Sequence, residues 1–301
     1  MNYQKFRERI LEALHDFYGS DAAIVVKEIA KNNDVYCEGI LIQKTEEDRH
    51  MCPIFYLDDL YEDYCNGRKT MEDCVGTAIE MREENKLNER VEAFAESILC
   101  WEEVKEFVYP ALVSAAANEK VLSDLVSASF LDLAVIYMIR KEVMPFECSS
   151  VKITKPLMEQ YRITPGELHM QAMENIKKDG YVFRNMKDIF ADFLPVETEK
   201  TEEEPFVAGE LYVLTNKQKR WGAAGLLHQD WLKEQLGNIS CYIMPSSIHE
   251  TIFVPILEGM DAKVLSQMVV DVNRSHVAVQ ERLSDHCYLY NGRTQTICSC
   301  E

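Results

Sequence analysis

The stretch from Pro245 to Glu250 is the densest group of reactive side chains in the sequence. It reads Pro-Ser-Ser-Ile-His-Glu and lies between two apolar runs that favour β-strands. A serine, a histidine and a carboxylate are the parts of a serine hydrolase, in which a base takes the proton of the nucleophile and an acid orients the base. On that hypothesis Ser247 is the nucleophile, His249 is the base, and Glu250 or Asp132 is the orienting group.

Strand geometry argues against this catalytic interpretation. If the strand already begins at Ser247, then Ser247 and His249 lie on one face about 7 Å apart, and Glu250 points to the other face. The segment also lacks the Gly-x-Ser-x-Gly setting of a nucleophile elbow. We therefore expect a bend with local hydrogen bonds, and a binding surface formed by Asn216, Ser246, Ser247, His249 and Glu250. A hydrolase that uses Ser247 and His249 is the alternative.

Soft metal ligands gather near the end of the sequence. His286 and Cys287 begin a predicted hairpin, and Cys298 and Cys300 end it. Small zinc sites are often built from such residues, but neither cysteine pair has Cys-x-x-Cys spacing. We expect no metal and no other cofactor. These four residues are the candidate ligands if a metal binds, and oxidation of the cysteines to a disulfide is the favoured alternative.

The segment Gly222-Ala-Ala-Gly225 is too simple a pattern for a phosphate-binding loop. It has neither the Gly-x-Gly-x-x-Gly pattern of dinucleotide sites nor the Gly-Lys-Ser/Thr ending of a P-loop. We interpret it as small residues within a helix that pack closely against a strand. Asp132 interrupts an apolar run, and we expect it to be paired or to cap an element.

Composition and charge restrict the class of protein. The 301 residues are 47% hydrophobic and 28% charged, with only 12 Gly and 9 Pro, which is typical of a soluble globular chain. The formal net charge of −19 has the wrong sign for nucleic acid or an anionic membrane, so we expect neither as a partner. The first 15 residues are too highly charged for a secretory signal, and the ten cysteines are widely spread. We expect a cytoplasmic protein with reduced thiols.

Most of the negative charge lies in two segments. Residues 45–106 contain 18 acidic and 7 basic residues, and residues 197–204 contain five acids and one lysine. The first segment includes a long helical pattern, so its charge is most simply a solvated helix face; the alternative is an acidic surface that binds a basic protein partner. Mimicry of nucleic acid is a third, less favoured hypothesis. The second segment lies between Pro195 and Pro205 and is typical of a linker or exposed loop.

Apolar periodicity and turn signals predict an α+β fold. The expected helices lie at 6–17, 58–64, 70–99, 118–125, 165–176, 218–236 and 262–272. The expected strands lie at 22–29, 35–43, 51–56, 104–113, 130–139, 210–214, 240–244 and 251–256, with a closing hairpin around Asn291-Gly292. Thr164 followed by Pro165 and Glu167 is the sharpest helix start.

The strands come as pairs and hairpins, which favours mixed or antiparallel sheets with packed helices in two or three subdomains. Charge and punctuation predict an acidic N-terminal region at 1–103 and a middle region at 104–195. They also predict an acidic linker at 196–208 and a C-terminal region at 209–301.

Three segments carry a family resemblance: Glu210–Asn216, Gly222-Ala-Ala and, most specifically, Tyr242–Glu250 with its Pro-Ser-Ser-Ile-His-Glu sequence. They resemble a bacterial family of uncharacterised proteins, a domain of unknown function typical of Gram-positive gut bacteria. The resemblance implies a cytoplasmic bacterial protein and gives no residue an activity. We therefore predict a binding or regulatory module without catalytic activity. Its expected surfaces are the 245–250 loop with Asn216 and the acidic helix at 70–99, which would contact a protein partner.

Overall fold

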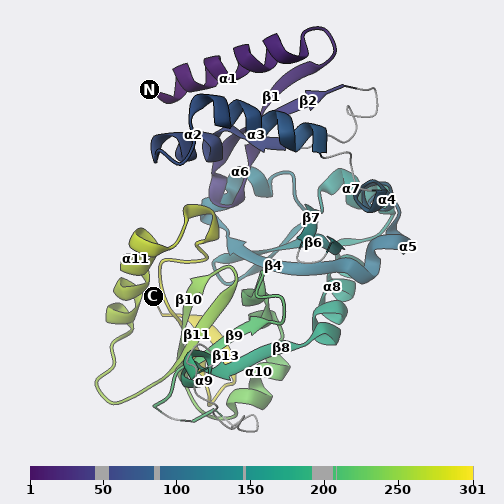
Figure 1. The fold of residues 1–301 in the computed structure, drawn as a ribbon. Coiled ribbons are helices and arrows are strands. Elements are labelled where there is room, and N and C mark those ends of the chain that lie inside the picture. Colours follow the sequence, from purple (N-terminus) through teal and green to yellow (C-terminus); the bar gives the residue numbers. More distant parts are fainter. Residues whose placement is uncertain (45–53, 85–88, 145–146, 192–205, 208, 301) are drawn as a thin grey trace. The chain divides into compact units, whose positions relative to one another are not determined.

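The computed structural model describes residues 1–44, 54–84, 89–144, 147–191, 206–207 and 209–300 (Figure 1). The chain forms two compact units. The first unit contains Met1–Lys31, Val35–Ile98 and Glu142–Glu147, and the second contains Asn32–Asp34, Leu99–Lys141 and Cys148–Glu301. Glu142–Glu147 of the predicted middle region belong to the first unit, and the rest of that region lies in the second unit with the predicted C-terminal region. Of the predicted linker at 196–208, only residues 206 and 207 lie within the described residues.

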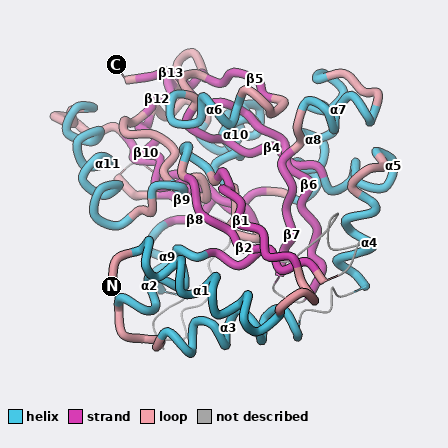
Figure 2. Tube along the Cα trace, turned by 90° about the horizontal axis from the view of Figure 1, so that it is seen from above, coloured by secondary structure: helices cyan, strands magenta, loops and turns pink. Residues whose placement is uncertain are grey.

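The first unit packs helices on a three-stranded antiparallel sheet with the strand order β1-β2-β3. Its elements are α1 (Tyr3–Tyr18), β1 (Ala23–Ala30), β2 (Tyr36–Gln43), β3 (Ile54–Tyr56), α2 (Leu57–Cys65), α3 (Met71–Glu84) and α4 (Glu89–Ser97). Phe6, Ile10 and Leu14 recur on one face of α1 and are fully buried, as the helical spacing predicts. Figure 2 shows α1 and α3 side by side over the sheet.

The predicted helix at 70–99 is present as α3 up to Glu84 and as α4 from Glu89, and residues 85–88 lie outside the described residues. Its predicted start is confirmed. The Thr70 hydroxyl accepts a hydrogen bond from the Asp73 backbone N–H at 3.1 Å, and the Asp73 carboxylate accepts one from the Thr70 N–H at 2.8 Å. Phe17, by contrast, lies off the buried face of α1 and is 59% exposed.

The second unit contains two larger sheets, and the strand pairs whose register is described are antiparallel. The four-stranded sheet has the order β4-β6-β5, with β7 also paired to β6, and the six-stranded sheet has the order β13-β12-β10-β11-β9-β8. The strands are β4 (Val108–Ser114), β5 (Ser127–Phe130), β6 (Leu133–Met144), β7 (Glu147–Lys152), β8 (Tyr181–Asn185), β9 (Tyr212–Asn216), β10 (Cys241–Ser247), β11 (Glu250–Pro255), β12 (Tyr288–Asn291) and β13 (Thr296–Ser299). The α+β prediction with antiparallel sheets is confirmed.

Short and long helices connect these strands. The α-helices are α5 (Trp101–Val104), α6 (Glu119–Leu122), α7 (Lys155–Tyr161), α8 (Pro165–Asp179), α9 (Met186–Ala191), α10 (Gln229–Leu236) and α11 (Ala262–His276). The 3₁₀ turns are η1 (Asn32–Asp34), η3 (Lys105–Phe107), η4 (Ala116–Asn118), η5 (Gly222–Leu227) and η6 (Val279–Glu281). Within the described ranges, none of the helices is both long and apolar enough to span a membrane.

Three sequence predictions in this unit are corrected. The predicted strand at 104–113 begins only at Val108, since the Asn175 side chain donates to the carbonyls of Lys105 and Val108 and holds a helical turn before it. The predicted strand at 130–139 is broken by a turn in which Leu131 has a φ of 55°. The predicted helix at 218–236 is replaced by a loop, η5 and α10. An apolar pattern does not show where such turns fall.

Candidate functional site

The Pro-Ser-Ser-Ile-His-Glu segment forms the tight hairpin between β10 and β11. Ser247 pairs with Glu250 across the hairpin, so Ile248 and His249 are the turn residues. The Ser247 hydroxyl accepts a hydrogen bond from the His249 backbone N–H at 3.0 Å, and the Ser246 hydroxyl donates to the Glu250 carboxylate at 3.4 Å. The expected bend is present with Ile248 and His249 at its turn, and the expected local hydrogen bonds are present.

The His249 side chain connects this turn to two other segments. Its Nδ1 atom accepts a hydrogen bond from the Trp221 backbone N–H at 3.0 Å. Its Nε2 atom lies 3.7 Å from a carboxylate oxygen of Glu281. Since an accepting Nδ1 carries no proton, the neutral ring holds its proton on Nε2, which faces Glu281.

The described residues do not assemble the hydrolase triad that the sequence left as an alternative. The Ser247 hydroxyl is bonded to the turn backbone, and Glu250 interacts with Ser246. The Nδ1 atom of His249, which an acid orients in a triad, is occupied by a backbone amide. Asp132 interacts with His286 and Tyr288 instead.

The Trp221 amide belongs to a loop that Asn216 closes. The Asn216 side chain donates to the Arg220 carbonyl at 2.7 Å and accepts from the Arg220 backbone N–H at 3.2 Å. Trp221 is in the left-handed region with a φ of 58°. Asn216 and His249, two of the predicted binding residues, therefore hold the consecutive residues Arg220 and Trp221 at the end of the 217–221 loop.

Gly222 allows the loop to approach the hairpin closely. A Cβ atom at this position would overlap the Thr215 hydroxyl and would lie 2.5 Å from the His249 carbonyl oxygen. The Thr215 hydroxyl also donates a hydrogen bond to that carbonyl at 2.8 Å. Close packing by small residues at this segment is as expected from the sequence, although the segment is a 3₁₀ turn and not the middle of an α-helix.

The loop forms one wall of a pocket of about 390 Å³ in the second unit. Asn216, Lys217 and Gln218 line this wall. The C-terminal end of α8 supplies a second wall from Ile176 to Gly180, and Tyr109 of β4 with Arg140 of β6 supplies a third. We call this space the loop pocket.

Arg140 was missed in the sequence analysis, although it is the first charged residue after the apolar run of β6. Its side chain is held between protein groups: Nη1 donates to the Arg220 carbonyl at 3.0 Å, and the guanidinium carbon lies 4.1 Å from the centre of the Tyr109 ring. The residue is only 6% exposed. A basic residue at the end of an apolar strand was the signal that could have found it.

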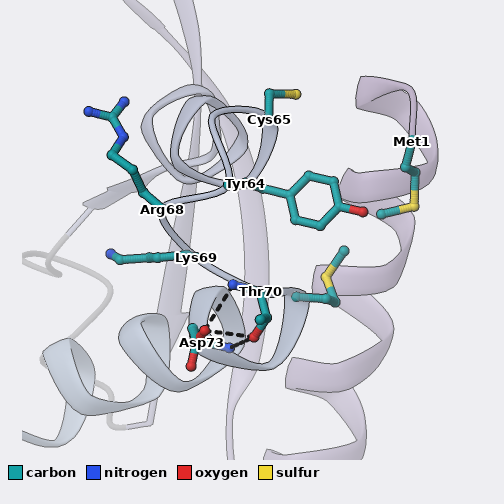
Figure 3. Close-up of a pocket in the computed structure, with 9 residues that line it drawn as sticks. Met1, Tyr64, Cys65, Arg68, Lys69, Thr70 and Asp73 are labelled. Atoms are coloured by element: carbon teal, nitrogen blue, oxygen red, sulfur yellow. Dashed lines mark hydrogen bonds between the residues drawn. The ribbon is translucent and has the colours of Figure 1, made fainter.

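A wider, shallow hollow lies in the first unit between the end of α2 and the start of α3 (Figure 3). Its basic side chains already have acidic partners, since Arg68 and Lys69 both form ion pairs with Asp63 at 3.0 and 3.3 Å. The dashed lines between Thr70 and Asp73 in Figure 3 mark the cap of α3. These groups explain the local helix ends without a ligand.

Asp132, His286 and Tyr288 form a separate cluster. One Asp132 oxygen lies 3.1 Å from His286 Nε2, and the other accepts a hydrogen bond from the Tyr288 hydroxyl at 2.9 Å. Burial raises the pKa of Asp132, but these hydrogen bonds lower it more, so the pKa lies below its ordinary value. The cluster links the β5–β6 turn to β12, and Asp132 is paired as the sequence predicts.

Of the four candidate metal ligands, Cys287 and Cys300 contact each other, whereas His286 and Cys298 have other partners. His286 Nε2 lies beside Asp132, the Cys287 thiol donates to the Ala262 carbonyl, and the Cys298 thiol donates to the Leu289 carbonyl. Burial, together with Cys287, raises the pKa of Cys300 to about 12, so its thiol is protonated. Across the part of the chain that the structure describes, no three His, Cys, Asp or Glu side chains are grouped to hold a metal ion.

Comparison with known proteins gives a family but no activity. The model of a family of unknown function, DUF5688, matches residues 3–292. No curated protein and no solved structure matches the chain.

Proposed function

Because the chain belongs to DUF5688, a family of unknown function, and the loop pocket is built in its second unit, we propose that it is a non-catalytic binding module of the bacterial cytoplasm. Its ligand site is the loop pocket. We attribute the dense polar sequence of Pro245–Glu250 to a role in shaping this pocket and not to catalysis.

One observation carries the proposal: the His249 ring accepts the Trp221 amide hydrogen bond. This bond, the Asn216 clamp on Arg220 and the close approach of Gly222 fix the 217–221 loop from three sides. A fixed loop is a pre-organised wall, and pre-organisation lowers the entropy cost of ligand binding. His249 is on this basis a positioning residue.

The thiols and the charge of the chain support the proposed compartment and the proposed kind of partner. The free thiols among the described residues and the net charge of −19 agree with a reducing compartment and with avoidance of nucleic acid. The acidic residues of α3 remain our proposed contact for a basic protein partner, which would respond to ligand binding.

Two substitutions of His249 separate the binding module from the hydrolase. Asparagine has a side-chain oxygen near the position of Nδ1, so His249→Asn keeps an acceptor for the Trp221 amide and removes the Nε2 atom that a hydrolase would need as its base. His249→Ala removes both. We expect native mass spectrometry of protein purified from a bacterial host to detect a bound small molecule in the wild type and in His249→Asn, and much less in His249→Ala.

The same proteins are assayed against a panel of ester, amide and phosphoester substrates. Turnover that is lost in both His249→Asn and Ser247→Ala, with folding intact by circular dichroism, would overturn the binding-module proposal in favour of the hydrolase. Absence of any retained ligand in the wild type at all salt concentrations would also contradict it.

A further inference from the structure

The loop pocket is positively charged within a strongly acidic protein. Arg140, Lys178 and Lys217 line it, against the single acid Asp179. Lys178 lies at the rim, where it pairs with Glu106 at 3.3 Å and is largely exposed. The net charge of the whole chain is −19, whereas the lining of this pocket has more basic than acidic residues. Such a local excess of basic groups attracts anions.

The buried base of the pocket is pre-arranged. The Arg140 guanidinium is held by the Arg220 carbonyl and lies over the Tyr109 ring, so it does not have to lose side-chain freedom on binding. Planar guanidinium groups bind carboxylate and phosphate oxygens with directed, charge-assisted hydrogen bonds. The same Arg220 carbonyl also accepts a hydrogen bond from the Asn216 side chain. Arg140 is in this way connected to the loop that Asn216 and His249 hold.

The outer wall carries donors that are available to a ligand. No hydrogen bond or ion pair of the Lys217 or Gln218 side chain is found among the residues that the structure describes. Both side chains extend from the loop that Asn216 and His249 hold. An ammonium and an amide at the mouth, opposite a guanidinium at the base, are suited to an oxyanion.

The size of the pocket and its apolar surfaces limit the ligand. A volume of about 390 Å³ is near the lower end of the range for small-molecule sites. Tyr109 and Ile176 add apolar surface beside the basic groups. We propose that the loop pocket binds a small organic anion, with its phosphate or carboxylate group between Arg140 and Lys217 and its carbon skeleton against Tyr109 and Ile176. This inference rests on the proposed binding function and names the class of ligand.

Isothermal titration calorimetry of the full-length chain at low salt tests the proposal. The probes are glycerol 3-phosphate and succinate, with glycerol as the neutral control and inorganic phosphate to show whether the anionic group alone is sufficient. We expect one of the two organic anions to bind, glycerol not to bind, and affinity to fall as salt rises. Because a hydrogen bond to a charged group is involved, Lys217→Gln is expected to weaken binding about tenfold.

Lys233→Gln is the control, since it removes the same charge from a partly exposed lysine on α10 that pairs with Asp230 and does not line the pocket. Arg140→Gln is expected to abolish binding. Because Arg140 is buried, this substitution can also prevent folding, and in that case Lys217→Gln alone tests the proposal. Equal weakening by Lys217→Gln and Lys233→Gln, or binding of neither organic anion, would overturn the inference. In those cases a small molecule of other chemistry retained in native mass spectrometry would leave the proposed binding function standing.

Discussion

At the scale of single residues, Gly222 sets how closely the loop approaches the β10–β11 hairpin. Gly222→Ala places a methyl group against the Thr215 hydroxyl and the His249 carbonyl, so the loop must shift. Such overpacking costs about 1–3 kcal/mol, and we expect that loss of unfolding free energy in urea denaturation.

Gly76 provides a matched control for this substitution. It lies in α3, where the methyl group of an alanine would have no neighbouring atom within 4 Å, and alanine is the better helix former. We expect Gly76→Ala to be neutral or to stabilise by up to about 1 kcal/mol. If Gly222→Ala were equally harmless, the loop and the hairpin would not lie as close together as the structure shows.

Asp132 predicts a pH dependence. Its pKa is lowered in the folded chain, so its interactions with His286 and Tyr288 stabilise the fold above its unfolded pKa of about 3.9 and are lost as pH falls through the folded pKa. We expect Asp132→Asn to lose stability near pH 6, by at most about 1 kcal/mol because the carboxylate is partly exposed, and the difference from wild type to shrink toward pH 3. Urea denaturation across this range measures it. A difference that grows on acidification would contradict the cluster.

At the scale of elements, the cap of α8 connects helix stability to the pocket wall. The Thr164 hydroxyl accepts from the Glu167 N–H at 3.2 Å, and the Glu167 carboxylate in turn accepts from the Thr164 N–H at 2.7 Å. We expect Thr164→Ala to cost about 1 kcal/mol in urea denaturation and to weaken binding of the organic anion. Thr154→Ala removes the equivalent cap of α7, which does not line the pocket, and should cost similar stability while leaving binding unchanged.

The predictable elements are those whose signals are local. Thr164, Pro165 and Glu167 specify the start of α8 within a few residues, and the capping box is present as predicted. The loop at 217–221 is different, because it is held by Asn216 and by His249 from the turn between β10 and β11. The apolar spacing of a helix continues through this part of the sequence. Only contacts with residues far away in the sequence make the segment a loop.

Only some residues of the candidate site were predicted from the sequence. His249 was recognised as a polar residue between two predicted strands and Asn216 was named with it, and both hold the loop. Arg140 and Tyr109 were missed, since antiparallel pairing of β4 and β6 brings them to the pocket from positions 31 residues apart. Sequence spacing carries no information on that convergence.

At the scale of the whole molecule, the two units have separate cores and separate optical probes. The described core of the first unit includes Leu14, which is fully buried, and all three tryptophans of the chain (Trp101, Trp221 and Trp231) lie in the second unit. We expect Leu14→Ala to cost about 2–5 kcal/mol and to move the unfolding of the first unit to lower urea by circular dichroism. The tryptophan fluorescence transition should move much less. Equal shifts of both transitions would show that the units unfold as one.

The central claim is that this acidic chain binds a ligand in the loop pocket. Hydrogen exchange of the full chain with and without glycerol 3-phosphate or succinate, whichever binds more tightly, tests it most directly. We expect slower exchange in peptides that cover residues 214–222 and 176–181, no change in the first unit, and a smaller effect in Lys217→Gln at a probe concentration near the dissociation constant of the wild type. Protection confined to residues 245–250 or to the first unit, or no protection at saturating probe, would contradict the claim.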